Sequence, residues 1–343
     1  MLPLGKQLIL FDGGMGSELE RRGLEGIPEE LNITHAGEIR AIHRAYAEAG
    51  ADIITANSFG LNAVKYRGKY SIAELARAAV ENARAAGKEV FFDVGPTGAL
   101  LAPVGTLSFD EAYEAFAEIA RLTSDMVGGY IVETFSDLYE LKACVLALKE
   151  YSDKPVYATV TFDSTARTLT GSTPEIVAEL LEGLGVDALG VNCSLGPQEL
   201  LPIVERLLAA TDLPVIVQPN CGLPKLREGR TCYDLTEDEF ESWMRRFVGM
   251  GVAVVGGCCG TTPAYIRRLA PLRGRPVPAR CIKKGTVVCS ATQRLVIEDV
   301  RICGERLNPT GKKALKEALL AENYDYLVSE AIRQQDAGAD LLD

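Results

Sequence analysis

The stretch Val252-Ala253-Val254-Val255-Gly256-Gly257-Cys258-Cys259-Gly260-Thr261-Thr262-Pro263 joins an apolar run to a glycine-rich turn that carries two adjacent cysteines. A short run of Val and Ala that ends at glycines is typical of a buried strand. Thr262 before Pro263 is typical of a helix start, with threonine as the N-cap and proline as the first helical residue. The stretch therefore predicts a strand, a turn and a helix, with two thiols on the turn.

The same strand and helix unit recurs along the chain. Apolar runs that are followed by turn residues and a helical pattern occupy residues 8–11, 52–56, 90–94, 130–133, 156–161, 188–192, 214–218 and 252–256. Runs without alternation are typical of parallel strands that are buried on both faces. Ser108 with Glu111 and Thr236 with Glu239 fit the capping box of a helix start, and Thr173 precedes a proline.

Eight such units in about 275 residues predict an α/β protein with a (β/α)8 TIM barrel. A doubly wound open sheet is the alternative. It is disfavoured because no G-x-G-x-x-G fingerprint follows any of the runs.

The cysteines of the turn are suited to a metal. Cys258 and Cys259 are neighbours, so their Cα atoms lie about 3.8 Å apart, closer than a disulfide prefers. A third cysteine, Cys193, ends the sixth predicted strand in a similar glycine and proline context. The sixth and eighth strands of a barrel end near each other, so we expect the three thiols to meet. Three thiolates with one open position are typical of a catalytic zinc site, whereas structural sites have four protein ligands.

Composition excludes several classes of function. The chain has 343 residues, a net charge of −11 and a pI near 5.0, which argues against nucleic acid or an anionic membrane as partner. No apolar run approaches the ~20 residues of a membrane span, and the apolar run at residues 8–11 is too short for a signal peptide. Nine cysteines, several beside glycine turns, indicate reduced thiols in the cytoplasm. Only two histidines are available for other chemistry.

Polar residues at the predicted strand ends indicate the substrate. A metal deprotonates a bound thiol, so the open position suggests alkyl transfer to a thiol substrate. Asp12 and Glu133 could hold its ammonium group, while the backbone N–H groups of Gly13 and Gly14 could receive a carboxylate. These features fit an amino acid that bears a thiol.

Each of these residues also has a purely structural reading. Cys193 alone is compatible with a small buried apolar side chain, Asp12 with a turn, and Glu133 with an ion pair inside the barrel. Asn192 and Asn220 could simply bond to loop backbone. His43 is expected to be a packed helix residue.

Together the motifs of residues 12–16, 55–60, 133–135, 190–193 and 256–261 resemble the homocysteine S-methyltransferase family. The resemblance implies Zn²⁺ on Cys193, Cys258 and Cys259, with the sulfur of L-homocysteine as the fourth ligand. It further implies that Asp12 and Glu133 hold the amino group, beside Asn192, Gly13 and Gly14. Asn220 matches a position that approaches the zinc when substrate is absent.

The character of the sequence changes after residue 278. Residues 279–299, with Lys283 and Lys284, are expected to be a linker that follows a homocysteine-binding domain of residues 1–278. Residues 300–343 predict a strand, one long helix over about 312–336 and a second strand, an incomplete segment of a second barrel. Such a fragment cannot bury its own apolar face, so we expect that face to pack on the first barrel or on another chain.

The segment Gly304-Glu305-Arg306-Leu307-Asn308-Pro309-Thr310-Gly311 resembles the opening of the pterin-binding barrel in the cobalamin-dependent methionine synthases of this family. This implies pterin contacts by Glu305, Arg306 and Asn308, and methylcobalamin as the methyl donor, carried by a cobalamin-binding module or corrinoid protein and recharged from methyltetrahydrofolate. Betaine or S-methylmethionine are the alternative donors. A non-catalytic subunit, in which the zinc is a structural clip, is the other reading.

Overall fold

A computed structural model describes residues 4–223, 225–227, 230–280, 282 and 285–343. Eight parallel strands are arranged in the order β1-β10-β7-β6-β5-β4-β3-β2. Their bounds are β1 Ile9–Leu10, β2 Ile53–Thr55, β3 Glu89–Val94, β4 Gly129–Phe135, β5 Val156–Val160, β6 Ala188–Asn192, β7 Val215–Gln218 and β10 Val254–Val255. A parallel bridge between Phe11 and Ile53 joins the two ends of this order and closes the ring. The predicted (β/α)8 barrel is therefore confirmed.

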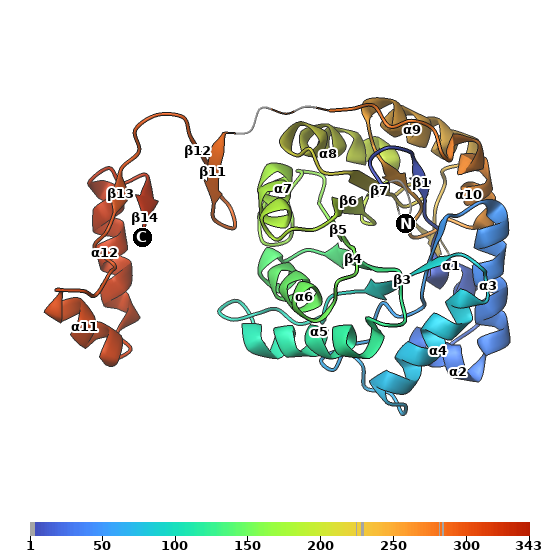
Figure 1. Ribbon diagram of the computed structural model, residues 1–343, viewed down its shortest axis with the longest axis horizontal. Coiled ribbons are helices and arrows are strands. Elements are labelled where there is room, and N and C mark those ends of the chain that lie inside the picture. The colour runs from blue at the N-terminus through green and yellow to red at the C-terminus, as the bar shows by residue number, and fades with distance from the viewer. Residues whose placement is uncertain (1–3, 224, 228–229, 281, 283–284) are drawn as a thin grey trace. The chain divides into compact units, whose positions relative to one another are not determined.

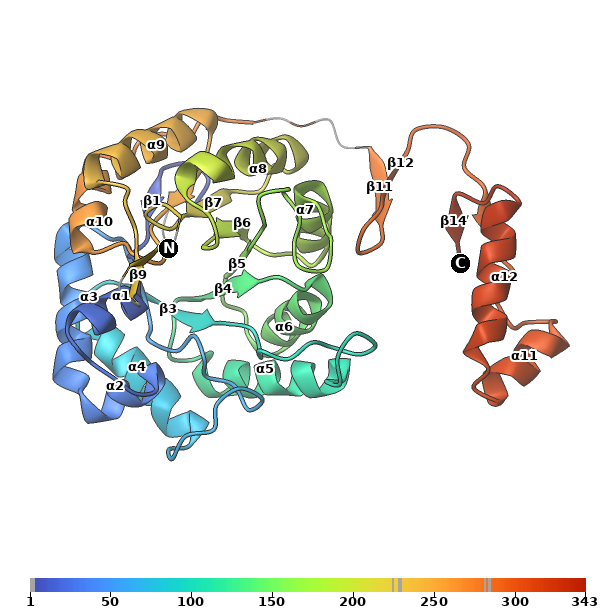
Figure 2. The ribbon, with the colours of Figure 1, turned by 180° about the vertical axis from the view of Figure 1, so that it is seen from behind.

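Helices surround the strands on the outside (Figures 1 and 2). They are α1 Met15–Arg21, α2 Leu31–Thr34, α3 Ala36–Ala49, α4 Ile72–Arg84, α5 Phe109–Thr123, α6 Leu138–Tyr151, α7 Pro174–Gly183, α8 Pro197–Ala210, α9 Glu237–Met250 and α10 Pro263–Leu269, with short 3-10 turns at Pro28–Glu30 and Ala270–Leu272. The predicted capping boxes of Ser108 and Thr236 both form, and Pro174 and Pro263 begin their helices. These caps satisfy N–H groups that the first helical turn leaves free.

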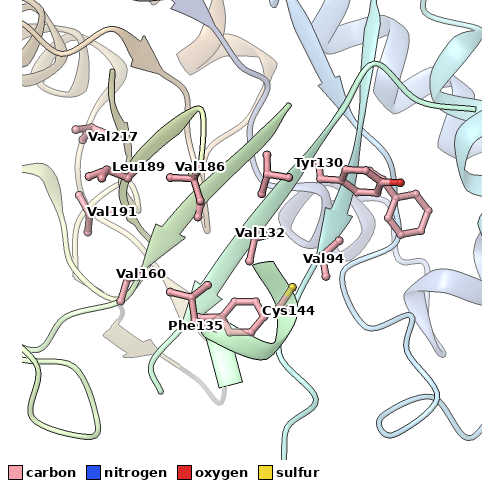
Figure 3. Close-up of a cluster of buried hydrophobic side chains, with 14 of the residues drawn as sticks. Val94, Tyr130, Val132, Phe135, Cys144, Val160, Val186, Leu189, Val191 and Val217 are labelled. Carbon is pink, nitrogen blue, oxygen red and sulfur yellow. The ribbon is translucent and has the colours of Figure 1, made fainter. Parts of the chain in front are cut away.

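The core has two layers. The larger one fills the space between the strands and the helices; Val132, Phe135 and Cys144, drawn in Figure 3, are fully buried there. The smaller one lies inside the barrel and includes Phe91 and Tyr157, whose ring centroids are 4.9 Å apart. Because side chains fill the barrel interior, only the ends of the strands can form a site.

The structure contains two hairpins that the sequence did not predict. A hairpin of β8 Lys225–Arg227 and β9 Arg230–Cys232 follows β7, and a second hairpin, β11 Thr286–Cys289 and β12 Arg294–Ile297, lies within the expected linker. Lys283 and Lys284 of that linker lie outside the described residues.

The prediction of one long helix over residues 312–336 is wrong. Two helices, α11 Lys313–Leu320 and α12 Tyr324–Asp336, are separated by Glu322, whose φ is 54°. Asn323 then caps α12 by accepting the N–H of Tyr326. The predicted flanking strands are present as β13 Cys303–Gly304 and β14 Leu341–Leu342, which pair in parallel.

The chain divides into two compact units. One is the barrel through Ile282 together with Cys289–Gln293, and the other contains the described residues 285–288 and Arg294–Asp343. In the second unit few apolar side chains are buried, Leu315 and Ala318 among them, while Val300, Leu320 and Val328 are 93%, 78% and 56% exposed. The boundaries predicted for the homocysteine and pterin domains stay predictions.

Candidate active site

A cavity of about 500 Å³ opens at the carboxyl ends of the barrel strands. Its wall includes the predicted residues Asp12, Gly13, Gly14, Glu133, Cys193, Cys258 and Cys259, and further residues such as Thr55, Phe59, Asp93, Gln218 and Tyr233. The barrel thus gathers side chains that lie far apart in sequence at the end where this fold places its active sites.

The three predicted cysteines meet at this cavity. Their Sγ atoms all lie within 4.8 Å of one another, and those of Cys193 and Cys259 are 3.7 Å apart. Two sulfurs at about 2.3 Å from one tetrahedral zinc are about 3.8 Å apart. The spacing between these thiols therefore fits a shared zinc ion.

Backbone hydrogen bonds from the strand ends hold these thiols in place. Cys193 donates its N–H to the carbonyl of Gln218 at 3.1 Å, and Cys258 donates to the carbonyl of Pro219 at 2.9 Å. Cys193 and Ser194 both have a φ of 55°, a left-handed conformation that non-glycine residues adopt at a cost. Strain of this kind concentrates at functional sites, because the surrounding structure must enforce it.

Asn220 positions the backbone of the cysteine cluster. Its amide oxygen accepts the N–H of Cys259 at 3.1 Å, and its side chain is buried. The structure thus gives Asn220 a backbone-positioning contact beside the thiols. The expectation that it approaches the metal without substrate stays a prediction.

The two glycine-rich turns of the site interlock. Gly257 donates its N–H to the carbonyl of Asp12 at 3.0 Å, and Gly14 donates to Thr261 Oγ1 at 3.1 Å. A Cβ on Gly14 would lie 2.6 Å from the carbonyl oxygen of Cys258, so only glycine allows this approach. Because the N–H of Gly14 is already donated inside the protein, Gly13 is the better candidate to receive a carboxylate.

The thiols cannot all ionise easily on their own. Hydrogen bonds from Cys193 and Cys258 lower the pKa of Cys259 to about 3, so one thiolate is favoured. Hydrogen bonds with Cys193 and Cys259, together with burial, raise the pKa of Cys258 well above its ordinary value. Three adjacent thiolates therefore require a cation to balance their charge, and a bound zinc ion would supply it.

Asn192 links the cysteines to Glu133. Its amide oxygen accepts the N–H of Thr134 at 2.9 Å and the hydroxyl of Thr159 at 2.9 Å. Its amide nitrogen donates to Thr134 Oγ1 at 2.8 Å and lies 3.9 Å from Cys258 Sγ. Thr134 has a φ of 66°, so Asn192 fixes the strained residue that follows Glu133.

The two predicted ammonium ligands differ in their surroundings. Asp12 accepts the N–H and the hydroxyl of Thr55, both at 2.8 Å, and burial raises its pKa to about 7 despite these bonds. Burial also raises the pKa of Glu133 to about 8, helped by the charges of Cys193 and Asp12. A cation bound between them would favour their charged forms.

Asp93 and Gln218 are site residues that received no role from the sequence. Asp93 Oδ1 and Gln218 Oε1 are buried and have no hydrogen-bond partner among the described residues. Both residues lie at predicted strand ends, and that position is the only sequence signal that could have found them. Buried polar atoms without partners indicate that something else completes the wall.

The predicted pterin residues lie in the second unit and are exposed. Arg306 donates its backbone N–H to Gln334 Oε1 at 2.7 Å, and Asn308 Oδ1 accepts the N–H of Thr310 at 2.9 Å. Glu305, Arg306 and Asn308 are therefore on one short loop after β13. Their role in pterin binding stays a prediction.

The remaining predictions concern histidine and membranes. His43 is fully buried on α3, as expected of a packed helix residue. No helix among the described residues is long and apolar enough to cross a bilayer.

The fold and the cavity define a (β/α)8 barrel with a three-thiol candidate metal site at the carboxyl ends of its strands. A family model described as "Homocysteine S-methyltransferase" matches residues 9–272. The chain belongs to the homocysteine S-methyltransferase family.

Relatives named "Methionine synthase" from Mycobacterium tuberculosis (strain ATCC 25618 / H37Rv) and Mycobacterium leprae (strain TN) are each 34% identical to this chain. The alignments cover 99% of this chain but 31% of each relative. The chain therefore spans less than a third of the length of these relatives.

Solved structures of the homocysteine methyltransferase MmuM from Escherichia coli share the fold. The metallated form has a TM-score of 0.65 and 23% identity, and covers 78% of this chain and 96% of that one. The apo form has a TM-score of 0.63 and 25% identity, with the same coverage.

Proposed function

We propose that this chain binds Zn²⁺ and L-homocysteine and transfers a methyl group to the homocysteine thiol, which gives methionine. The observation that carries this proposal is the meeting of Cys193, Cys258 and Cys259 in one cavity, at a sulfur spacing that fits zinc. Bound zinc would hold the substrate sulfur as a thiolate at neutral pH.

The chain's own residues would bind and orient the amino acid. Asp12 and Glu133 would accept hydrogen bonds from the ammonium group, and Thr55 holds the Asp12 carboxylate in place. The N–H of Gly13 would receive the carboxylate. Asn192 would hold Glu133 and Cys258 in position relative to each other, because it contacts Thr134, which follows Glu133, and Cys258.

We propose methylcobalamin as the methyl donor, carried by another module or a corrinoid protein. Support comes from the mycobacterial relatives named methionine synthase, whose alignment covers 99% of this chain and so runs beyond the barrel. In this reading residues 300–343 begin a pterin-binding barrel. The cytoplasmic location stays a prediction.

The test replaces one thiol. Cys258→Ala should remove stoichiometric zinc and the methylation of homocysteine from added methylcobalamin together. The matched control is Cys303→Ala, which alters an exposed, unpaired cysteine of the second unit and should leave both unchanged. A Cys258→Ala protein that retains zinc and activity would refute the proposal.

Two alternatives can be separated from it. Betaine and S-methylmethionine should be poor donors when they are assayed beside methylcobalamin. A structural zinc clip requires four protein ligands, but the cluster found among the described residues contains three.

A further inference from the structure

Asp93 is a buried carboxylate of this cavity whose Oδ1 accepts no hydrogen bond from the described residues. It lies near the end of β3, and its backbone is fixed by Ser58, which donates its hydroxyl to the Asp93 carbonyl at 2.9 Å and accepts the Asp93 N–H at 3.1 Å. The side chain is 7% exposed and lines the cavity, yet Oδ1 has no donor within the described chain. The fold thus places this carboxylate firmly and leaves it without a partner.

Three other buried carboxylates accept hydrogen bonds from the protein. Asp12 accepts two hydrogen bonds from Thr55, and Glu29 accepts the N–H of Gly60 at 2.6 Å. Glu140 accepts both the N–H and the hydroxyl of Thr97. A buried carboxylate oxygen without a donor is costly, so its retention at Asp93 suggests that a ligand supplies the donor.

The charge of the wall indicates the kind of ligand. Asp12, Asp93 and Glu133 all line the same cavity, and each of the other two raises the pKa of Asp93 after burial itself. Lys65 also acts on Asp93, but it is an exposed residue whose Nζ lies 4.4 Å from the centre of the Phe59 ring. An ammonium group offers three N–H donors, which matches three carboxylates.

We propose that Asp93 is the third acceptor for the ammonium group of the substrate and that it makes the cavity selective for amino thiols. The inference rests on the proposed function, because it assumes that an amino acid thiol binds here. Asp93 acts on the ammonium end of the substrate, away from the sulfur. Its loss should therefore weaken the binding of amino thiols but not the binding of thiols that lack the amine.

The test compares three thiols by calorimetry with the zinc-loaded chain, without any methyl donor. The thiols are L-homocysteine, 4-sulfanylbutanoate, which lacks the amine, and 3-sulfanylpropan-1-amine, which lacks the carboxylate. Asp93→Asn should raise the Kd of the two amines about 10- to 100-fold, as expected when one charge-assisted hydrogen bond is lost. The Kd of 4-sulfanylbutanoate should stay the same or fall, because a negative charge has been removed. The control Asp153→Asn makes the same charge change on an exposed residue at the opposite end of the barrel and should leave all three Kd values unchanged.

Zinc content and thermal unfolding identify a variant that is misfolded, and in that case Asp93→Ser replaces Asp93→Asn. If a folded variant bound all three thiols equally more weakly, Asp93 would have a structural role and the inference would be overturned. Unchanged binding of homocysteine would also overturn the inference. Failure of the wild-type chain to bind homocysteine would instead overturn the proposed function, and the inference with it.

Discussion

The left-handed backbone at Thr134 depends on the side chain of Asn192. Asn192→Ala would remove the acceptor of the Thr134 N–H and the nearer of the two acceptors of the Thr159 hydroxyl. We expect a loss of about 1–3 kcal/mol in the free energy of unfolding, together with weaker homocysteine binding because Glu133 precedes Thr134. Urea unfolding of Asn192→Ala measures this loss, with Thr165→Ala in an exposed loop as the control. Equal stability of the two variants would contradict the role of Asn192.

His43 predicts a pH dependence of stability. Burial lowers its pKa from 6.5 to about 3, and neither ring nitrogen has a hydrogen-bond partner in the described chain. Between these pH values the unfolded chain binds a proton that the folded chain does not, so this residue makes stability fall as the pH falls.

We expect His43→Leu to remove that contribution. The stability of the variant relative to wild type should rise by about 1.4 kcal/mol for each pH unit below 6.5, as seen by denaturant unfolding at pH 7, 5.5 and 4.5. A difference that stays constant over this range would show that His43 is protonated in the folded protein.

At this scale the sequence predicted the residues that end strands, but not their contacts. The three cysteines could be placed together because the order of strands in a barrel is known. The partner of Asp12, the use of the Gly14 N–H and the unpartnered oxygen of Asp93 depend on side-chain and loop geometry that no sequence pattern encodes.

At the scale of elements, the approach of β6 to β7 depends on Gly190. A Cβ at this position would lie 1.9 Å from the carbonyl oxygen of Ile216, so the two strands would have to separate. We expect Gly190→Ala to destabilise the barrel by several kcal/mol and to displace Cys193, lowering zinc content. Gly183→Ala, near the end of α7 with open space around it, should be neutral or slightly stabilising. Thermal unfolding of both variants measures this difference. Equal losses of stability in the two variants would contradict this account.

The barrel elements were predictable because each buried strand is a continuous apolar run and each capped helix start has a local signal. The hairpins β8–β9 and β11–β12 were missed because their strands are only three or four residues long and contain at most a short apolar run. The break between α11 and α12 was missed because Ala321 and Glu322 favour a helix, whereas Asn323 starts a new one by capping it.

At the scale of the whole molecule, the two units differ in how much apolar surface they bury. The barrel has a large core, whereas in the second unit Val300, Leu320 and Val328 are exposed. That the barrel or another chain covers this face stays a prediction. We therefore expect amide hydrogens of residues 300–343 to exchange much faster than those of the barrel strands. Hydrogen exchange with mass spectrometry measures this. Equal protection of both units would mean that this face is covered in solution.

The account depends most on three protein sulfurs that leave one metal position open. X-ray absorption of the zinc-loaded chain, before and after L-homocysteine is added, tests it directly. We predict three sulfur ligands before addition and four afterwards. Four sulfur ligands without homocysteine, or a coordination shell that homocysteine does not change, would contradict it.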